Sequence, residues 1–212
     1  MGGAGDTREE ILDAGCGALG LDVSTDQQAL LLEHLDILAR WNRTHNLTAV
    51  TQPGAMVAQH VLDSLSVLGH VKGNRVLDIG SGGGFPGLPI AITRPDIEVV
   101  LLDSRGKRVE FLRFVIGRLG LDNISAVQGR VEDFRPGEKF DTLVARAFSS
   151  LSNLLDWTTH LQLPSTRVLA MKGKSPEGEL ESLPQALSAR ARVFPLHVPS
   201  LDAERHLVQL DY

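Results

Sequence analysis

A glycine-rich loop is the most specific chemical feature of the sequence. The segment DIGSGGGFPG at residues 78–87 follows a short β-branched run that is typical of a strand. Gly80, Gly82 and Gly84 allow the backbone to turn sharply and to approach a ligand closely, because no Cβ stands in the way. A glycine run alone is equally compatible with a structural turn, so its interpretation depends on the residues around it.

An acidic residue after the next predicted strand indicates a nucleoside ligand. Asp103 lies 23 residues after Gly80, where a carboxylate in a βαβ unit accepts hydrogen bonds from ribose hydroxyls. The loop lacks the Lys-Ser or Lys-Thr ending of a P-loop, which excludes ATP hydrolysis of that kind. After the third strand, Val131 is expected to flank an adenine ring, and an acid or backbone group at residues 132–133 is expected to accept from its amino group. Alternatively, Glu132 and Asp133 only solvate a loop.

Asp78 distinguishes between two nucleoside cofactors. A carboxylate two residues before Gly80 would repel the pyrophosphate of a dinucleotide, whereas it would attract the cationic ammonium and sulfonium of S-adenosylmethionine. We therefore expect S-adenosylmethionine as the cofactor. A nicotinamide-dependent oxidoreductase remains the alternative.

Alternating strand and helix patterns position these residues. The expected strands are at 75–79, 97–102, 124–127, 141–145, 167–171, 192–198 and 206–211. The expected helices between them are at 87–93, 105–119, 150–161 and 177–190. This order predicts an α/β fold with a mostly parallel sheet buried on both faces, and the last two strands are expected to form a hairpin.

Two amphipathic helices precede the sheet. A capping box at Ser24 and Gln27 begins a helix over 25–43, and Pro53 begins a second one over 53–68. We expect residues 1–72 to form a helical N-terminal extension or cap. Residues 73–212 are expected to form one compact unit.

Composition places limits on the function classes. The 212 residues are 42% hydrophobic, and their longest aliphatic runs are too short to cross a bilayer. A single cysteine, Cys16, excludes internal disulfides and cysteine zinc clusters, and no metal site is expected. Residues 1–11 show no signal peptide pattern, so we expect a cytoplasmic protein. The net charge is -5, but residues 1–36 hold eight acids and one arginine, which leaves +2 for the rest.

Taken together, the motifs resemble the RsmG family, also called glucose-inhibited division protein B. The resemblance covers roughly residues 25–211 and rests on these segments: WNR at 41–43, NLTA at 46–49, HVLDSL at 60–65, LDS at 102–104, GKR at 106–108, FL at 111–112, RVE at 130–132, RAF at 146–148 and KG at 172–173. Two positions depart from the family pattern. His45 replaces a common Tyr, and the segment Gly83-Gly84-Phe85 replaces a common Pro-Gly-Leu.

The resemblance implies a class I methyltransferase fold, a Rossmann-like seven-stranded sheet in residues 73–212 with a helical N-terminal cap. It also implies methylation of guanine N7 in the 530 loop of bacterial 16S rRNA, with S-adenosylmethionine as cofactor. The partner would be 16S rRNA within the small ribosomal subunit or an assembly intermediate, with no membrane and no obligate protein partner. By the family pattern, Gly80, Phe85, Val131, Glu132 and Arg146 would line the cofactor site. With the residues inferred from the sequence pattern, the expected cofactor-binding residues are Asp78, Gly80, Gly82, Gly84, Phe85, Asp103, Ser104, Val131, Glu132 and Arg146.

Methylation of guanine N7 requires no general base, because that nitrogen already carries a free lone pair. No catalytic residue is assigned, and Arg146 and His60 are the candidates. His60 and Asp63 lie three residues apart on one helix face, where they would either reach the RNA or active-site floor or bond to each other on the surface. The expected RNA contacts are Arg43, His60, Lys107, Arg108, Lys172 and Lys174.

Two other functions are also compatible with the sequence. One is a methyltransferase of the same fold that acts on a small molecule. The other is a non-catalytic RNA-binding assembly factor that retains the cofactor fold.

Overall fold

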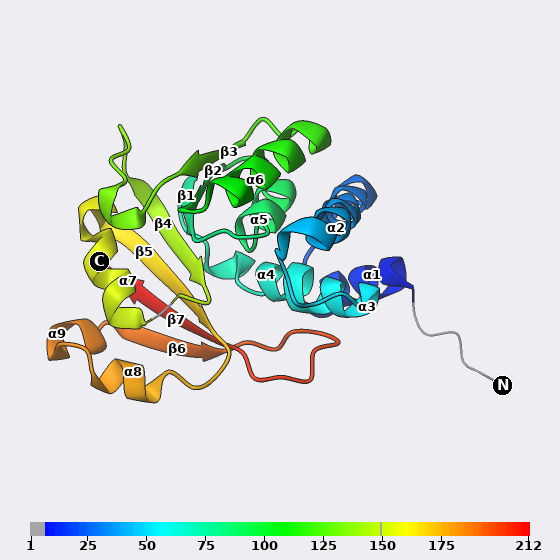
Figure 1. Ribbon diagram of the computed structural model, residues 1–212. Helices are drawn as coiled ribbons and strands as arrows, with labels where there is room; N and C mark the ends of the chain where they lie inside the picture. Colours follow the sequence, from blue (N-terminus) through cyan, green and yellow to red (C-terminus); the bar gives the residue numbers. More distant parts are fainter. Residues whose placement is uncertain (1–6, 149) are drawn as a thin grey trace.

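A seven-stranded sheet with the order β3-β2-β1-β4-β5-β7-β6 forms the centre of the computed structural model, which describes residues 7–148 and 150–212 (Figure 1). β7 runs antiparallel to both its neighbours, and the other strands pair in parallel. The strands are β1 Arg75–Ile79, β2 Glu98–Asp103, β3 Ile124–Gln128, β4 Phe140–Arg146, β5 Gln162–Lys172, β6 Ala191–Pro195 and β7 His206–Asp211. The predicted seven-stranded, mostly parallel α/β sheet and its final hairpin are confirmed.

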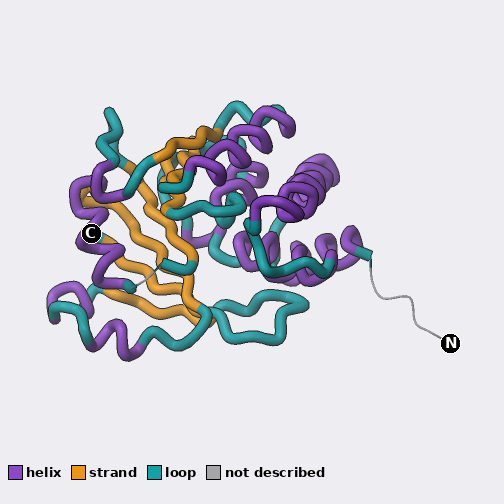
Figure 2. The backbone as a smooth tube through the Cα atoms, in the orientation of Figure 1, coloured by secondary structure: helices purple, strands orange, loops and turns teal. Residues whose placement is uncertain are grey.

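Alternate residues of the central strands enter two separate hydrophobic cores. Val76 of β1 and Val144 of β4 belong to one core, whereas Leu77 of β1 and Leu143 of β4 belong to the other. Successive side chains of a strand point to opposite faces, so the strands need apolar residues at nearly every position when both faces are covered. Figure 2 shows the helices on the two sides of the sheet.

Helices α5, α6 and α7 cover the two faces. Helices α5 (Gly87–Thr93) and α6 (Gly106–Leu119) lie on one face, and α7 (Leu151–Thr158) lies on the other. Short helices complete this part: the 3-10 turns η3 Val131–Asp133 and η4 Thr159–Leu161, and the helices α8 Glu177–Glu181 and α9 Gln185–Ser188. The single helix predicted over 177–190 is wrong. The chain breaks before Pro184, because proline has no N–H to donate and disfavours a helical residue before it.

The N-terminal helices pack on the same face as α5 and α6. They are α1 Arg8–Ala18, α2 Thr25–His45, α3 Pro53–Met56, the π-helix η1 Val57–Leu62, α4 Asp63–Leu65 and the 3-10 turn η2 Leu68–His70. The helix predicted at 25–43 is confirmed. The helix predicted at 53–68 instead contains a π-helical stretch, which spreads its side chains differently from a regular α-helix.

A continuous core joins these helices to the sheet. Leu35 and Leu38 of α2 lie in the same buried cluster as Leu88 of α5 and Phe111 of α6. The division of the chain at residue 72 stays a prediction. None of the helices in the described residues is long and apolar enough to span a membrane. The absence of a signal peptide was predicted from residues 1–11, of which residues 1–6 lie outside the described part of the chain.

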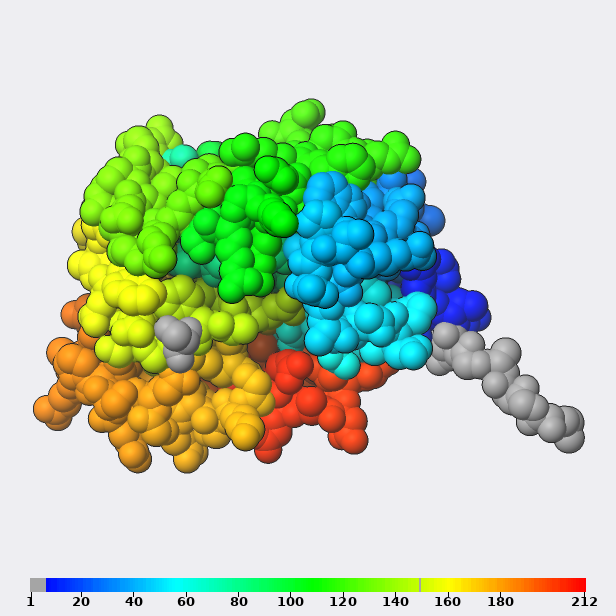
Figure 3. Space-filling view, in the orientation of Figure 1, coloured from blue at the N-terminus to red at the C-terminus, as the bar shows by residue number. Residues whose placement is uncertain are grey.

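The loop between β6 and β7 reaches back to the N-terminal helices. In Figure 3 its red surface lies directly against the cyan surface of the segment that contains α3, η1 and α4. Val198 is buried in the first core, and Leu196 and Leu201 pack against it. The loop ends beside the carboxyl end of β5, where Lys172 pairs with His206.

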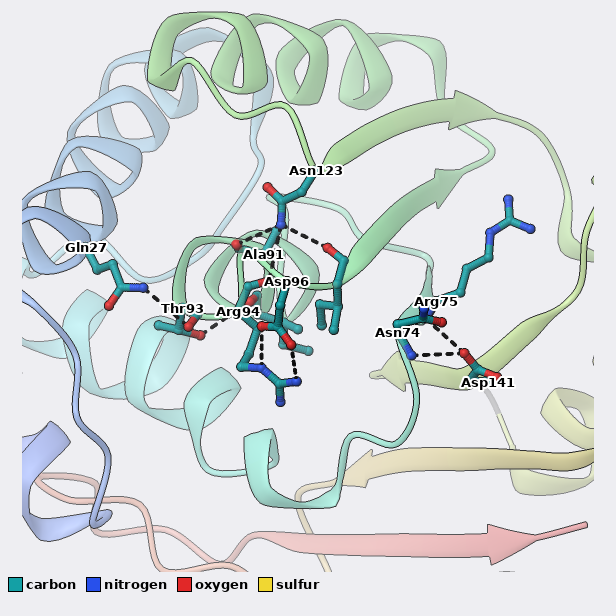
Figure 4. A network of polar contacts seen from close by, with 11 residues as sticks. Gln27, Asn74, Arg75, Ala91, Thr93, Arg94, Asp96, Asn123 and Asp141 are labelled. Carbon is teal, nitrogen blue, oxygen red and sulfur yellow. Dashed lines mark hydrogen bonds and ion pairs between the residues drawn. The ribbon is translucent and has the colours of Figure 1, made fainter.

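Side-chain amides fix the edge of the sheet at which the parallel strands begin (Figure 4). The Asn123 amide donates to the backbone carbonyls of Ala91, Arg94 and Ile97 at 3.0, 3.3 and 3.0 Å. The Gln27 amide of α2 donates to the carbonyl of Ile92 at 3.0 Å. The last carbonyls of a helix lack partners within it, so these contacts satisfy the end of α5 and fix it against β2 and α2.

Replacing Asn123 by Ala should destabilise the fold. The change removes the amide that three backbone carbonyls share, and we expect the free energy of unfolding to fall by roughly 1–3 kcal/mol. Equilibrium unfolding in urea measures the effect. Asp122→Ala is the matched control, since its neighbouring side chain is exposed. Equal urea midpoints for the two variants would contradict this role of Asn123.

Candidate active site

Two adjoining cavities lie at the carboxyl edge of the sheet and share Ala147 as a lining residue. The β2 cavity, of about 500 Å³, is lined by Ile79, Gly80, Leu102, Asp103, Ser104, Arg105, Arg108, Gly129, Arg130, Val131, Glu132, Ala147, Phe148 and Trp157. The β5 cavity, of about 390 Å³, is lined by Gln59, His60, Asp63, Arg146, Ala147, Met171, Lys172, Gly173 and Arg205. Open α/β sheets bind ligands at this edge.

The structure divides the predicted cofactor residues between three places. Gly80, Asp103, Ser104, Val131 and Glu132 line the β2 cavity, as neighbours on three successive strand ends. Arg146 lines the β5 cavity instead. The remaining four, Asp78, Gly82, Gly84 and Phe85, are not among the residues that line either cavity.

The glycine loop turns tightly above the end of β1. Gly80, Gly82 and Gly84 have φ values of 75°, 57° and 91°, in the left-handed region where glycine is favoured. A Cβ on Gly84 would also overlap the Leu88 side chain. The Gly80 amide donates to the carbonyl of Leu102 at 2.7 Å, which ties the loop to the end of β2. Gly82 and Gly84 thus determine the conformation of the loop without lining a cavity, whereas Gly80 lines the β2 cavity.

Asp103 organises the wall of the β2 cavity. Its carboxylate is 3% exposed and accepts hydrogen bonds from the amides of Gly82 and Arg105 at 3.0 and 2.9 Å. The Arg108 guanidinium adds a third contact at 3.3 Å. Two carboxylate oxygens offer about four acceptor positions, so one position remains for a ligand hydroxyl. Arg108 is paired with Asp103 rather than presented freely to an RNA phosphate.

Asp78 lies beneath the glycine loop and has no exposed surface. Its Oδ2 accepts from the Gly87 amide at 2.9 Å, which satisfies a free N–H at the start of α5. Its Oδ1 has no hydrogen-bond partner among the described residues. Burial raises the pKa of the Asp78 carboxyl to about 7. The structure places this carboxyl behind the wall of the β2 cavity. The direct contact with a cationic ligand that the sequence suggested stays a prediction.

Phe85 is buried in a ring stack that supports the β5 cavity. It lies between His34 and His60, with ring centroids 4.7 Å away on each side. The guanidinium carbon of Arg146 lies 5.1 Å from the centre of the Phe85 ring. An arginine over an aromatic face is attracted electrostatically. Phe85 therefore positions two residues of the β5 cavity, and its predicted contact with the cofactor stays a prediction.

His60 and Asp63 do not form the surface pair that was one interpretation of their spacing. Both are buried, at 7% and 2% exposure, and both line the β5 cavity. The His60 Nε2 lies 2.8 Å from the Thr48 hydroxyl. Burial, and then the positive charge of Arg146, lower the pKa of His60 to about 4, so its ring is neutral at pH 7.

The Asp63 carboxylate holds two arginines from distant parts of the chain. Its Oδ2 accepts from the Arg146 Nη1 at 3.3 Å, and its Oδ1 accepts from the Arg205 Nε at 3.0 Å. The Arg146 Nη1 also donates to the carbonyl of Gln59 at 3.1 Å. Arg146 therefore forms an ion pair with Asp63 at the wall of the β5 cavity. Arg205 was missed, because nothing in its local sequence distinguishes it from other loop arginines.

The six predicted RNA contacts differ in exposure, since His60 is buried in the β5 cavity and Arg108 is paired with Asp103. Arg43, Lys107 and Lys174 are exposed. Lys172, by contrast, forms an ion pair with Glu179 at 2.8 Å and has a largely buried side chain. The sequence also missed the aromatic pair Phe148 and Trp157 in the wall of the β2 cavity, which becomes visible only when α7 packs beside the end of β4.

Comparison with known proteins identifies the family. The family model described as rRNA small subunit methyltransferase G matches residues 27–208. This chain belongs to that family. A methyltransferase G from Chromobacterium violaceum is 48% identical over 200 residues, covering 94% of this chain and 95% of the relative. One from Vibrio atlanticus is 44% identical over 202 residues, covering 95% and 96% of the two chains. The predicted resemblance to the RsmG family is confirmed.

Similarity to solved structures supports a class I methyltransferase fold for this chain. A SAM dependent methyltransferase from Aquifex aeolicus has a TM-score of 0.53 and 17% identity, covering 74% of this chain and 92% of that one. M. capricolum TrmK, solved in complex with S-adenosyl-homocysteine, has a TM-score of 0.55 and 10% identity, covering 70% and 66%. The predicted class I, Rossmann-like fold is confirmed.

The buried Asp78 should make stability depend on pH. Its pKa is about 7 in the folded state and near 3.8 in an exposed carboxyl, so the folded state holds its proton more tightly. The wild-type stability that depends on this proton is fully present below about pH 4 and is lost as the pH rises through 7. Asp78→Asn should therefore gain stability relative to wild type between pH 4.5 and 8, by up to a few kcal/mol at roughly 1.4 kcal/mol per pKa unit.

Urea unfolding of both proteins at pH 4.5, 6 and 8 measures this difference. Titration of all other groups cancels between the two chains. A difference that stays constant across these three pH values would show that Asp78 is already ionised in the folded protein.

Proposed function

We propose that the protein transfers a methyl group from S-adenosylmethionine to N7 of a guanine in the 530 loop of small-subunit rRNA. The observation that carries the proposal is the pair of adjoining cavities at the carboxyl edge of the sheet, in a chain of the methyltransferase G family. One cavity is suited to a nucleoside and the other to a second reactant. Ala147, which lines both, marks where the two would meet.

The β2 cavity fits the nucleoside half of the methyl donor. Asp103 offers a carboxylate acceptor for a ribose hydroxyl, and Gly80 leaves the approach clear because it has no side chain. Val131 and Leu102 supply apolar surface for an adenine ring, next to the aromatic pair Phe148 and Trp157. Family membership favours this donor over a nicotinamide dinucleotide.

Methyl transfer to N7 asks the protein for alignment rather than for proton transfer. When bound, the donor would supply a methyl carbon activated by its sulfonium, so that the N7 lone pair would form the new N–C bond while the C–S electron pair returned to sulfur. No proton leaves first, so neutral His60 and the paired Asp63 need not act as bases. Their contribution is a fixed cavity wall, which orders the acceptor and excludes water.

Exposed cations are available for the RNA backbone. Arg43 follows Trp41 on α2, Lys107 lies in the first turn of α6, and Lys174 follows β5. Phosphate contacts of this kind position the RNA without reading its sequence. Affinity for rRNA should consequently fall as salt rises, which distinguishes this protein from a methyltransferase that acts on a neutral small molecule.

Asp103→Asn should weaken binding of the donor. The change removes the charge that accepts from a ribose hydroxyl, and hydrogen bonds to a charged group are worth roughly 1.5–3 kcal/mol, so the dissociation constant should rise by about tenfold or more. Calorimetry with S-adenosylhomocysteine measures it. Asp122→Asn is the matched control, since that side chain is exposed and lines neither cavity. Equal affinities for the two variants would refute the assignment of the β2 cavity.

The reaction itself is tested with small subunits from cells that lack this protein. Incubation with labelled S-adenosylmethionine should label the rRNA, and borohydride followed by aniline should cut it at one guanine in the 530 loop, because N7 methylation makes that site labile. Naked rRNA, assembling particles and finished subunits form three arms that identify the substrate state. Donor binding without label in any arm would favour the non-catalytic assembly factor.

A further inference from the structure

The β5 cavity carries a net positive charge on a wall of hydrogen-bond donors. Asp63 contributes one negative charge, and the two guanidiniums that it binds contribute two positive charges. The Lys172 ammonium is neutralised by Glu179. Burial keeps His60 neutral at pH 7. The balance is one uncompensated positive charge, which suits a ligand edge rich in acceptors.

Arg205 has a donor that the protein does not use. Its Nε donates to Asp63 at 3.0 Å and its Nη1 donates to the carbonyl of Glu204 at 2.8 Å. Its Nη2 makes no hydrogen bond with the described residues. The side chain is 23% exposed and lines the β5 cavity beside Gly173, where a Cβ would lie 3.9 Å from the Arg205 Nη1. The guanidinium is thus held on two sides and retains one N–H₂ group for a ligand.

The carboxylate that holds Arg205 is itself immobilised. The Asp63 side chain is 3% exposed, and Arg146 binds its other oxygen. A buried carboxylate that lost one of these partners would keep an incompletely compensated charge, which is costly. Asp63 therefore fixes the direction of the Arg205 guanidinium instead of leaving it mobile on the surface of the 196–205 loop.

We propose that the β5 cavity receives the target guanine and that the Arg205 guanidinium, positioned by Asp63, donates a hydrogen bond to its O6. This inference rests on the proposed function and names the specificity-determining residue of that reaction. Guanine presents O6 and N7 as neighbouring acceptors on one edge. A single N–H₂ group directed at O6 leaves the N7 lone pair open to the methyl carbon, whereas a bidentate contact would block it.

The same arrangement rejects adenine. Adenine also has N7, but it carries an N6 amino donor where guanine has O6. That donor would face the Arg205 donor and leave both unpaired, which costs more than the loss of an ordinary contact. Donor groups at this position thus select the purine without contacting the atom that reacts.

The test compares guanine with 2-aminopurine at the target position of rRNA reconstituted into small subunits. 2-Aminopurine keeps N7 and the 2-amino group but lacks O6. Single-turnover methylation rates are measured for both RNAs with wild type and with Arg205→Gln. We expect wild type to prefer guanine and Arg205→Gln to reduce that preference by about tenfold, mainly by slowing methylation of guanine. Asp63→Asn should reduce the preference in the same direction, because it releases Arg205.

Two controls separate specificity from folding and from donor binding. Arg192→Gln makes the same charge change at an exposed position of β6, and its preference should equal that of wild type. Arg205→Gln should bind S-adenosylhomocysteine as wild type does. A loss of that affinity, or an equal fractional loss of rate on both RNAs, would overturn the inference, because Arg205 would then serve the donor or a phosphate.

An unchanged preference in Arg205→Gln would also overturn it. Each of these outcomes leaves the proposed reaction intact, since wild type would still methylate guanine. Failure of wild type to methylate the guanine RNA would refute the proposed function itself.

Discussion

The parallel alignment of β1 to β5 is the constraint on which the rest of the structure depends. It places the ends of these five strands at one edge, so residues that are distant in sequence become neighbours there. Asp103 at the end of β2 and Arg146 at the end of β4 reach their cavities for this reason. The glycine loop adds a tight turn at this edge, and the Asp103 carboxylate fixes that turn through the Gly82 amide.

Buried charge then ties the N-terminal helices and the final loop to that edge. Asp63 begins α4, and its carboxylate is compensated by guanidiniums from β4 and from the loop before β7. Removing either guanidinium would leave part of a buried charge unpaired, so the three elements hold one another in place. The ring stack of His34, Phe85 and His60 extends this contact from α2 to the cavity wall. The cap and the sheet therefore build the β5 cavity together.

Local signals explain which features the sequence predicted. Buried β-branched runs and the glycine turn are determined by neighbouring residues, so strands β1 to β4 and the position of Asp103 could be derived from the chain itself. The helix α1 was missed, although Thr7 and Glu10 form a capping box that would have indicated its start. The contact between Arg205 and Asp63 spans 142 residues, and no local pattern encodes it. Phe85 was expected at the ligand because its whole loop was, yet its ring packs into the core.

Charge balance connects the cavity wall to the chemistry proposed for it. Methylation of N7 moves a positive charge from the sulfonium to the purine, so each of the two adjoining cavities must tolerate a cation. A cavity with two unpaired guanidiniums would oppose the methylated base, and one with a free carboxylate would compete for the cationic donor. The β5 cavity lies between these two cases, because its carboxylate Asp63 is bound by both arginines. The single remaining positive charge is enough to orient a neutral acceptor edge, and it favours release of the base once that base has itself become a cation.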